Sequence, residues 1–292
     1  MKTFRFKRVC FGLACSLYLL VATILAHLRI FPPSPAVTAL QRDLYVDDLV
    51  TGADSREDCI HLIKESTRIL LQGGFPLRQF FIPDEEIRSA CDIPLTEEQA
   101  ETKVLGLEWR SHDDSIAVAS VKSRIVTFTK RSASSILAKV YDPMGLISPI
   151  TVSAKVLLQK LWKAGVKWDE ALDHALTKAF QHVADSLKDL HLLRFPRFCG
   201  DGLQEGEETV IHVFCDASPE AYAACVYVNG QLFIAKNKVA PLKSLTLPRL
   251  ELQACVLGAK LALRVKKQLS FPTKILAWTD STIALGWIAA EN

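Results

Sequence analysis

Two groups of carboxylates carry the chemistry that this sequence suggests. The first is the adjacent pair Asp47 and Asp48, which follows the apolar lead-in Leu44–Val46 and precedes Leu49 and Val50. Adjacent carboxylates repel each other, and a divalent cation such as Mg²⁺ or Mn²⁺ offsets that repulsion. Two such ions can clamp the attacking and leaving oxygens of a phosphoryl transfer. The pattern predicts a hairpin with an acidic, metal-binding tip, but two aspartates in an ordinary surface turn would give the same pattern.

The second group is Asp216, Glu251 and Asp280. Asp216 interrupts the apolar run 210–218, which predicts a buried strand, and a buried carboxylate is costly unless a metal ion or a cationic group accompanies it. Glu251 lies near the start of a predicted helix, and Asp280 follows the predicted strand 275–278. The spacings are 251 − 216 = 35 and 280 − 251 = 29 residues. The three form a second candidate site for divalent cations, although each could separately be a helix cap or a strand-end residue.

The elements around this second group follow from turn and periodicity signals. Two strands, 221–228 and 231–239, are expected on either side of Asn229-Gly230, a strong hairpin signal. Thr246 can cap the next helix, whose apolar face comprises Leu250, Ala254, Leu257, Leu261 and Val265. Ser281 and Thr282 can cap a further helix. Four basic residues lie just before and within the start of the Glu251 helix, where they can meet a phosphate backbone: Lys236, Lys238, Lys243 and Arg249.

Earlier in the chain, caps and helix breakers predict the remaining elements. Ser55 can cap a helix over 54–71, which Gly73 ends. We expect a strand at 75–82, a polar loop at 83–102, a strand at 104–109 and a strand pair at 115–128 that exposes Lys122 and Arg124. Residues 130–195 are predicted to be mainly helical, with Thr151 capping one helix. Its lysines are expected to form a solvated basic face, with a phosphate-following face as the alternative: Lys155, Lys160 and Lys163.

Composition places the chain among folded globular proteins. It has 292 residues, of which 49% are hydrophobic and 23% charged, so extended disorder is excluded. The net charge of +3 neither requires nor excludes a nucleic-acid partner. The eight cysteines form no C-x-x-C pair and no zinc-type spacing. We therefore expect a reducing, intracellular location (cytoplasm or nucleus) without disulfides.

The N-terminus has the pattern of a targeting segment. Four basic residues in positions 2–8 precede a mostly apolar run, 9–26, as in a signal peptide or a membrane anchor. His27 and Arg29 interrupt the end of the run, so a buried helix of a larger domain is the competing interpretation. A membrane anchor through residues 9–31 is the alternative to the intracellular location, and we expect the membrane to be a less favoured partner.

Several stretches resemble retroelement reverse transcriptases. Residues 6–16 together with Tyr45–Asp48 resemble the segment that leads into the YxDD hairpin of those enzymes, with Leu17 where the family usually has proline. Residues 104–109 are similar to the strand that grips the primer end. The resemblance implies that 9–31 belongs to a polymerase palm, and that Asp47 and Asp48 hold Mg²⁺ or Mn²⁺ near a primer–template.

A longer stretch resembles one family more closely. Residues 129–149, followed by Ala154-Lys155 and Leu161-Trp162, are similar to the connection region of BEL/Pao-type LTR retrotransposon polyproteins, a region also labelled a Pao retrotransposon peptidase. Residues 216–218, 249–252 and 279–282 resemble the D-A-S, R-L-E-L and T-D-S-T motifs of ribonuclease H. That resemblance implies cleavage of the RNA strand of an RNA–DNA hybrid by divalent ions held at Asp216, Glu251 and Asp280.

These observations predict a mixed α+β and α/β chain in four segments. They are a partial reverse-transcriptase palm (1–110), a mainly helical connection (111–199), a linker (200–208) and an incomplete RNase H-like mixed sheet with helices (209–292). Each candidate site lacks a carboxylate that the resemblance would add. We therefore expect an internal fragment of a retrotransposon polyprotein, partnered by the rest of that polyprotein, with no primer extension and at most weak hybrid cleavage.

Two other functions remain open at this stage. An aspartic peptidase would need D-T-G or D-S-G, and both Asp216-Ala217-Ser218 and Asp280-Ser281-Thr282 lack that glycine. A catalytically inactive nucleic-acid-binding remnant would keep the folds and the basic surfaces without turnover. Salt-sensitive binding without Mg²⁺-dependent cleavage would select the remnant.

Overall fold

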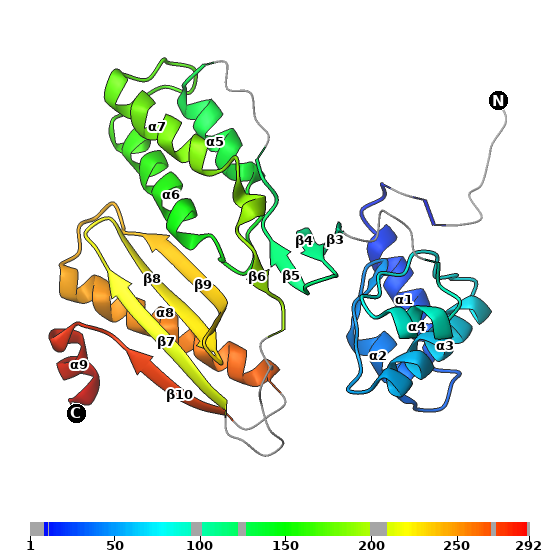
Figure 1. The fold of residues 1–292 in the computed structure, drawn as a ribbon. Helices are drawn as coiled ribbons and strands as arrows, with labels where there is room; N and C mark the ends of the chain where they lie inside the picture. Colours follow the sequence, from blue (N-terminus) through cyan, green and yellow to red (C-terminus); the bar gives the residue numbers. More distant parts are fainter. Residues whose placement is uncertain are drawn as a thin grey trace, which may run out of the picture. The chain divides into compact units, whose positions relative to one another are not determined.

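The computed structural model describes residues 9–10, 12–94, 101–121, 127–198, 209–269 and 273–290 (Figure 1). The chain forms two compact units, residues 1–99 and 100–292, with mixed helix and sheet. The predicted linker 200–208, together with Lys122 and Arg124, lies outside the described residues. The described cysteines are free thiols.

The first unit is mainly helical. Its elements are α1 (Ser16–Leu28), α2 (Pro35–Arg42), the two-residue strands β1 (Leu44–Tyr45) and β2 (Asp48–Leu49), α3 (Arg56–Gln72) and α4 (Glu85–Ala90). Buried residues of α1, α2 and α3 form its core, among them Leu28, Leu40 and Ile69. No helix within the described ranges combines the length and apolar character needed to cross a bilayer.

Two predictions for this unit are confirmed and two are wrong. The acidic hairpin forms, and Ser55 caps α3 by accepting a hydrogen bond of 3.1 Å from the Asp58 amide. The strand expected at 75–82 is absent from the described structure, where these residues are irregular. The loop expected at 83–102 contains α4, because Asp84 caps it by accepting a hydrogen bond of 3.0 Å from the Ile87 amide.

The second unit begins with a small antiparallel sheet, β3 (Glu101–Val104), β4 (Leu107–Arg110), β5 (Ser115–Ala117) and β6 (Phe195–Pro196). The single strand predicted at 104–109 is wrong. Leu105 and Gly106 have φ angles of +50° and +84°, so the apolar run turns back on itself between β3 and β4. Of the strand pair expected at 115–128, the described residues contain β5, and residues 122–126 lie outside the described ranges.

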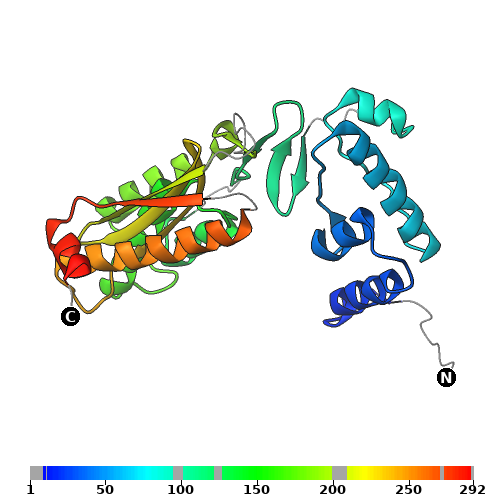
Figure 2. The same cartoon turned by 90° about the horizontal axis from the view of Figure 1, so that it is seen from below.

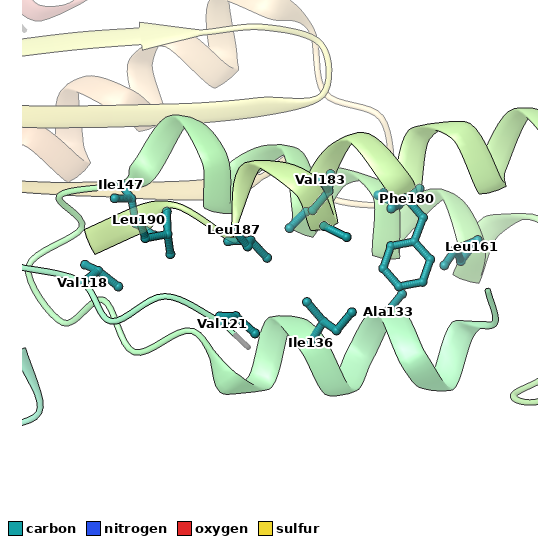
Figure 3. Close-up of a cluster of buried hydrophobic side chains, with 13 residues drawn as sticks. Val118, Val121, Ala133, Ile136, Ile147, Leu161, Phe180, Val183, Leu187 and Leu190 are labelled. Carbon is teal, nitrogen blue, oxygen red and sulfur yellow. The ribbon is translucent and has the colours of Figure 1, made fainter. Parts of the chain in front are cut away.

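Three helices follow, as predicted for 130–195: α5 (Lys130–Lys139), α6 (Ser148–Lys163) and α7 (His174–Ser186), with a short 3₁₀ turn η2 (Leu190–Leu192). Their buried side chains face one another in a single core, where Ile136, Leu161 and Phe180 come from the three different helices (Figure 3). The cap predicted at Thr151 is wrong because α6 begins at Ser148. Asp142 instead accepts hydrogen bonds from the amides of Leu146 and Ile147, at 2.8 and 3.1 Å.

A second sheet has the strand order β10–β7–β8–β9, with β7 (Thr209–Ala217), β8 (Ala221–Val228), β9 (Gln231–Val239) and β10 (Thr273–Trp278). The pair β7–β10 is parallel and the other pairs are antiparallel. Asn229 and Gly230 form the predicted hairpin turn, with φ angles of +50° and +74°. Helices α8 (Leu247–Gln268) and α9 (Thr282–Ala289) complete the element order predicted for this part.

Helix α8 covers one face of this sheet, and on the other face α6 contacts the edge strand β9. The predicted apolar face of α8 is buried against Ile211, Val213 and Cys215 of β7. Figure 2 shows α8 running along the sheet, and Figure 1 shows the helices α5–α7 beside the β9 edge. Gly258 of α8 permits the close approach, because a Cβ there would lie 2.3 Å from the Cys215 sulfur.

The contact between α6 and β9, which we call the α6–β9 seam, involves Met144, Gly145, Ser148, Thr151, Lys155, Ala235 and Asn237. The Asn237 side chain is 7% exposed and fully used: its amide nitrogen donates to the Ser148 carbonyl (3.1 Å) and to the Thr151 hydroxyl (3.0 Å). Its amide oxygen accepts from the Lys155 ammonium (2.7 Å). The solvated position predicted for Lys155 is therefore wrong, and burial lowers the pKa of this ammonium group.

The backbone adds to this seam. The amide of Ala235 donates to the Met144 carbonyl at 2.8 Å, which extends the hydrogen bonding of edge strand β9 to the loop before α6. Gly145 has φ +70°, and a Cβ there would lie 2.0 Å from the Ala235 carbonyl oxygen. The stretch 141–149, which carried the resemblance to the connection region, thus joins α6 to β9.

Candidate functional site

Asp216 lies near the carboxyl end of β7 on the face opposite α8. Residues Ile211, Val213 and Cys215 point toward α8 and are buried, so the alternating residues of the strand face the other way. Asp216 is exposed, and its carboxylate accepts a hydrogen bond of 2.6 Å from the Ala217 amide. The prediction that Asp216 is buried is wrong, and the desolvation argument for a metal at this position does not hold.

Asp280 is aligned with Asp216 by the parallel register of β7 and β10. Trp278 pairs with Phe214, and each aspartate is two residues beyond its paired aromatic residue. Adjacent strands lie about 4.8 Å apart, so the register places both aspartates at the same end of the sheet, where β7 and β10 finish. Asp280 is exposed, like Asp216.

Glu251 lies in the second turn of α8, next to the buried Leu250, and is half-buried. Its carboxylate accepts a hydrogen bond from the Ser281 hydroxyl, so the glutamate is held against the residue next to Asp280. The same hydroxyl accepts a hydrogen bond of 3.0 Å from the Ala284 amide and caps α9. The sequence identified Ser281 only as a cap. Its hydrogen bond to Glu251 could be found only once the packing of α8 against β10 was known.

The structure thus brings the three predicted carboxylates to one end of the sheet without gathering them into a closed site. Among the described residues, no three His, Cys, Asp or Glu side chains are grouped so that they could hold a metal ion. The donor type fits a hard divalent cation, because Mg²⁺ and Mn²⁺ prefer carboxylate oxygens. The side-chain positions do not yet fit one.

The four predicted phosphate contacts are all exposed. Lys236 and Lys238 alternate with the buried Asn237 on edge strand β9, and Lys243 and Arg249 follow toward the start of α8. They therefore run along the sheet edge that leads to Glu251. Lys236 and Lys238 lie on the α8 side of the sheet, since Asn237 between them faces α6.

The face that carries Asp216 also holds a row of aromatic side chains that sequence reasoning missed. Phe214 and Trp278 are nearly parallel, with ring centroids 6.3 Å apart, and the Trp278 indole donates to a ring nitrogen of His212 at 3.1 Å. Strand β7 was predicted to be buried as a whole. The alternation of its small and aromatic residues could have indicated one face that α8 leaves uncovered.

Cys215, next to Asp216, faces the core. Burial raises the pKa of its thiol to about 12, so it stays neutral near pH 7 and acts as a small apolar group under α8. Cys215 is therefore unsuited to act as a nucleophile beside Asp216.

The acidic hairpin in the first unit is a simpler structure. Tyr45 pairs with Asp48, and Val46 has φ +56° in the turn that carries Asp47. Both aspartates are exposed. The structure within the described part of this unit adds no third carboxylate to them.

Comparison with known proteins gives one family match. Residues 129–281 match the model of the Pao retrotransposon-like RNaseH-like domain. Solved structures of foamy viral protease-reverse transcriptase are similar at low identity. The complex with RNA/DNA hybrid has TM-score 0.49 and 14% identity, covering 96% of this chain and 35% of that one. A complex with dsDNA has TM-score 0.48 and 13% identity, covering 96% and 53%. The chain thus spans about half or less of the length of these structures. No curated protein matches the sequence.

Proposed function

The chain belongs to the Pao retrotransposon-like RNaseH-like domain family, and from that premise we propose that it is a portion of a retrotransposon polymerase polyprotein that cleaves the RNA strand of RNA–DNA hybrids. The rest of that polyprotein is its natural partner. In this proposal residues 1–110 are part of a reverse-transcriptase palm, 111–199 the connection and 209–292 the nuclease portion.

One observation supports the nuclease proposal: the carboxylates predicted from three separate motifs lie toward one end of the second sheet. The β7–β10 register aligns Asp216 with Asp280, and Ser281 holds Glu251 beside Asp280. Three carboxylates that converge from two strands and a helix repel one another, and a divalent cation would offset the repulsion. Asp216, Glu251 and Asp280 are therefore the residues that would hold Mg²⁺ or Mn²⁺.

Divalent ions at such a site would activate a water molecule and stabilise the leaving oxygen of the cleaved strand. The chain's own contribution is binding and positioning. The exposed cations Lys236, Lys238, Lys243 and Arg249 contact the phosphates of the hybrid, and Ser281 fixes the orientation of Glu251. Asp47 and Asp48 have the corresponding proposed role in the polymerase portion, toward a primer–template.

Cleavage of a labelled RNA–DNA hybrid tests the proposal. We expect slow cleavage that requires Mg²⁺ or Mn²⁺, stops with a chelator, and falls at least about 100-fold in Asp280→Asn and in Glu251→Gln, since each removes charge from the reacting centre. The matched control is Asp47→Asn/Asp48→Asn, which changes carboxylates of the other unit. Metal-dependent cleavage that survives in Asp216→Asn, Glu251→Gln and Asp280→Asn would refute the assignment.

A second candidate function is binding of nucleic acid without turnover. It is favoured by the absence, within the described ranges, of a closed group of three metal-binding side chains. Hybrid binding that weakens steeply with salt, with no cleavage at any Mg²⁺ or Mn²⁺ concentration, would select this function.

A further inference from the structure

Two tryptophans at the end of α6 form an exposed aromatic surface. Trp162 lies in the last turn of α6 and Trp168 in the segment after it, and they are 54% and 43% exposed. Their rings meet edge to face, with centroids 5.5 Å apart. Two neighbouring tryptophans usually lose most of their exposure on folding, because burial of such large rings is favourable. Their exposure indicates an interaction surface.

Basic side chains from the start of α5 hold these rings in place. The Lys130 ammonium is 4.0 Å from the centroid of the Trp162 ring and 5.2 Å from that of Trp168, and Lys130 is only 5% exposed. Arg131 lies 5.7 Å from the Trp168 centroid and pairs with Asp169 through two hydrogen bonds of 2.6 and 2.9 Å. Cation–π contacts and this ion pair therefore set the orientation of the rings before any partner binds.

The surroundings of the rings are basic. Lys163 and Lys167 are exposed, and neither forms an ion pair with another residue of the described ranges. Counting Lys130, Arg131, Lys163 and Lys167 against Asp169 and Glu170 gives 4 − 2 = +2. We call these six residues and the two tryptophans the Trp–Lys surface. Its charge is complementary to a polyanion.

This surface lies beyond the end of the sheet that carries the candidate carboxylates. Gln159 donates to the Ala240 carbonyl at 2.6 Å, and Lys160 forms an ion pair of 2.8 Å with Glu220. Ala240 follows β9, and Glu220 lies between β7 and β8, just after Asp216. Trp162 and Lys163 follow within one turn of α6, and Figure 1 shows α6 running beside β9.

We propose that the Trp–Lys surface binds the single-stranded nucleic acid that extends from a hybrid held at the carboxylate end of the sheet. The choice of partner rests on the proposed function. Unpaired bases expose ring faces that stack on aromatic side chains, and the exposed lysines contact the phosphates. Beside the rings, exposed lysines with no ion-pair partner in the described part of the chain favour a negatively charged partner. Nucleic acid combines that charge with bases that can stack on the rings.

Binding of two matched substrates tests the inference by fluorescence anisotropy. One is a blunt RNA–DNA hybrid, and the other is the same hybrid with a single-stranded extension. We expect the intact chain to bind the extended hybrid more tightly. Trp162→Leu/Trp168→Leu should lose that gain, about tenfold or more, while binding the blunt hybrid as before.

A charge variant keeps the test independent of ring packing. Lys163→Glu/Lys167→Glu should weaken binding of the extended hybrid and flatten its salt dependence by about two phosphate contacts. The control is Lys139→Glu, a single lysine-to-glutamate change at the other end of α5 with half the charge change of the double variant, and it should bind like the unmodified chain. Circular dichroism checks that each variant is folded.

The outcomes separate this inference from the function on which it rests. The inference that the Trp–Lys surface binds single-stranded nucleic acid would be overturned by equal affinity of the intact chain for the two substrates. It would also be overturned if both surface variants bound the extended hybrid as tightly as the intact chain. Either result would leave the nuclease proposal standing. If Trp162→Leu/Trp168→Leu bound the extended hybrid as tightly as the intact chain, the rings would not bind nucleic acid, and a protein partner would be indicated instead. Failure of the intact chain to bind either substrate would overturn both.

Discussion

The two acidic regions differ in how many elements of structure hold their carboxylates. Asp47 and Asp48 lie on a hairpin of two two-residue strands in the first unit. Asp216 comes from β7, Glu251 from α8 and Asp280 from the segment after β10, and a hydrogen bond from Ser281 joins that segment to α8. The hairpin depends on local turn chemistry, whereas the second region depends on contacts between residues far apart in the sequence.

That difference explains what each region can do alone. A hairpin presents adjacent carboxylates but cannot fix a third ligand without another element of structure. A sheet with a parallel pair aligns the ends of its strands, and a helix packed across it adds a group from a third direction. The second region therefore presents its three carboxylates from separate elements, and its support extends through β8 and β9 to the α6–β9 seam.

The largest loss of stability is expected when the α6–β9 seam is disrupted. Asn237→Ala leaves the partly buried Lys155 ammonium without its partner, so we expect the free energy of unfolding of the second unit to fall by about 2–4 kcal/mol. All five tryptophans lie in this unit, so urea unfolding followed by tryptophan fluorescence reports on it alone. Asp48→Asn, in the other unit, should leave this transition unchanged. A loss below about 1 kcal/mol for Asn237→Ala would mean that the seam contributes little.

A smaller effect is expected at the glycine of the same seam. Gly145→Ala adds a Cβ against the Ala235 carbonyl at a position with φ +70°, and we expect a loss of about 2–3 kcal/mol. Gly165→Ala is the matched control, because Gly165 has the same φ of +70° but open space around it. Only the backbone strain, about 1 kcal/mol, should remain there. Equal losses in the two variants would show that the contact with Ala235 does not matter.

The smallest stability effect is expected at the carboxylate end itself. Ser281→Ala removes the cap of α9 and the donor to Glu251, which should cost about 1 kcal/mol in the same unfolding experiment. Ser281→Thr keeps the hydroxyl and should restore most of the loss. If the alanine variant were as stable as the parent chain, the hydrogen bonds of Ser281 would not hold the two elements together.

Local signals in the sequence predicted much of the second sheet. Asn229-Gly230 fixed the hairpin between β8 and β9, since both residues adopt the positive φ that the turn requires. The spacing of Leu250, Ala254, Leu257, Leu261 and Val265 predicted the buried face of α8. The alignment of Asp216 with Asp280 depends on the parallel pairing of β7 and β10, which no local signal in the sequence predicted.

The sequence could not reveal contacts between distant segments. Lys155 was predicted to be solvated because its helix was considered alone, whereas its partner Asn237 lies 82 residues further along the chain. Asp216 was predicted to be buried because α8 was not known to cover one face of β7 only. Gly106 was assigned to a strand, since a local apolar run does not show where the chain reverses.

Mn²⁺ binding, followed by the electron paramagnetic resonance signal of the free ion, tests the central claim most directly. We expect that the chain binds Mn²⁺, that Asp216→Asn/Asp280→Asn abolishes tight binding, and that Asp47→Asn/Asp48→Asn retains the ion bound at the sheet. Unchanged binding in Asp216→Asn/Asp280→Asn would contradict the claim that these two aligned aspartates and Glu251 form a site for divalent cations.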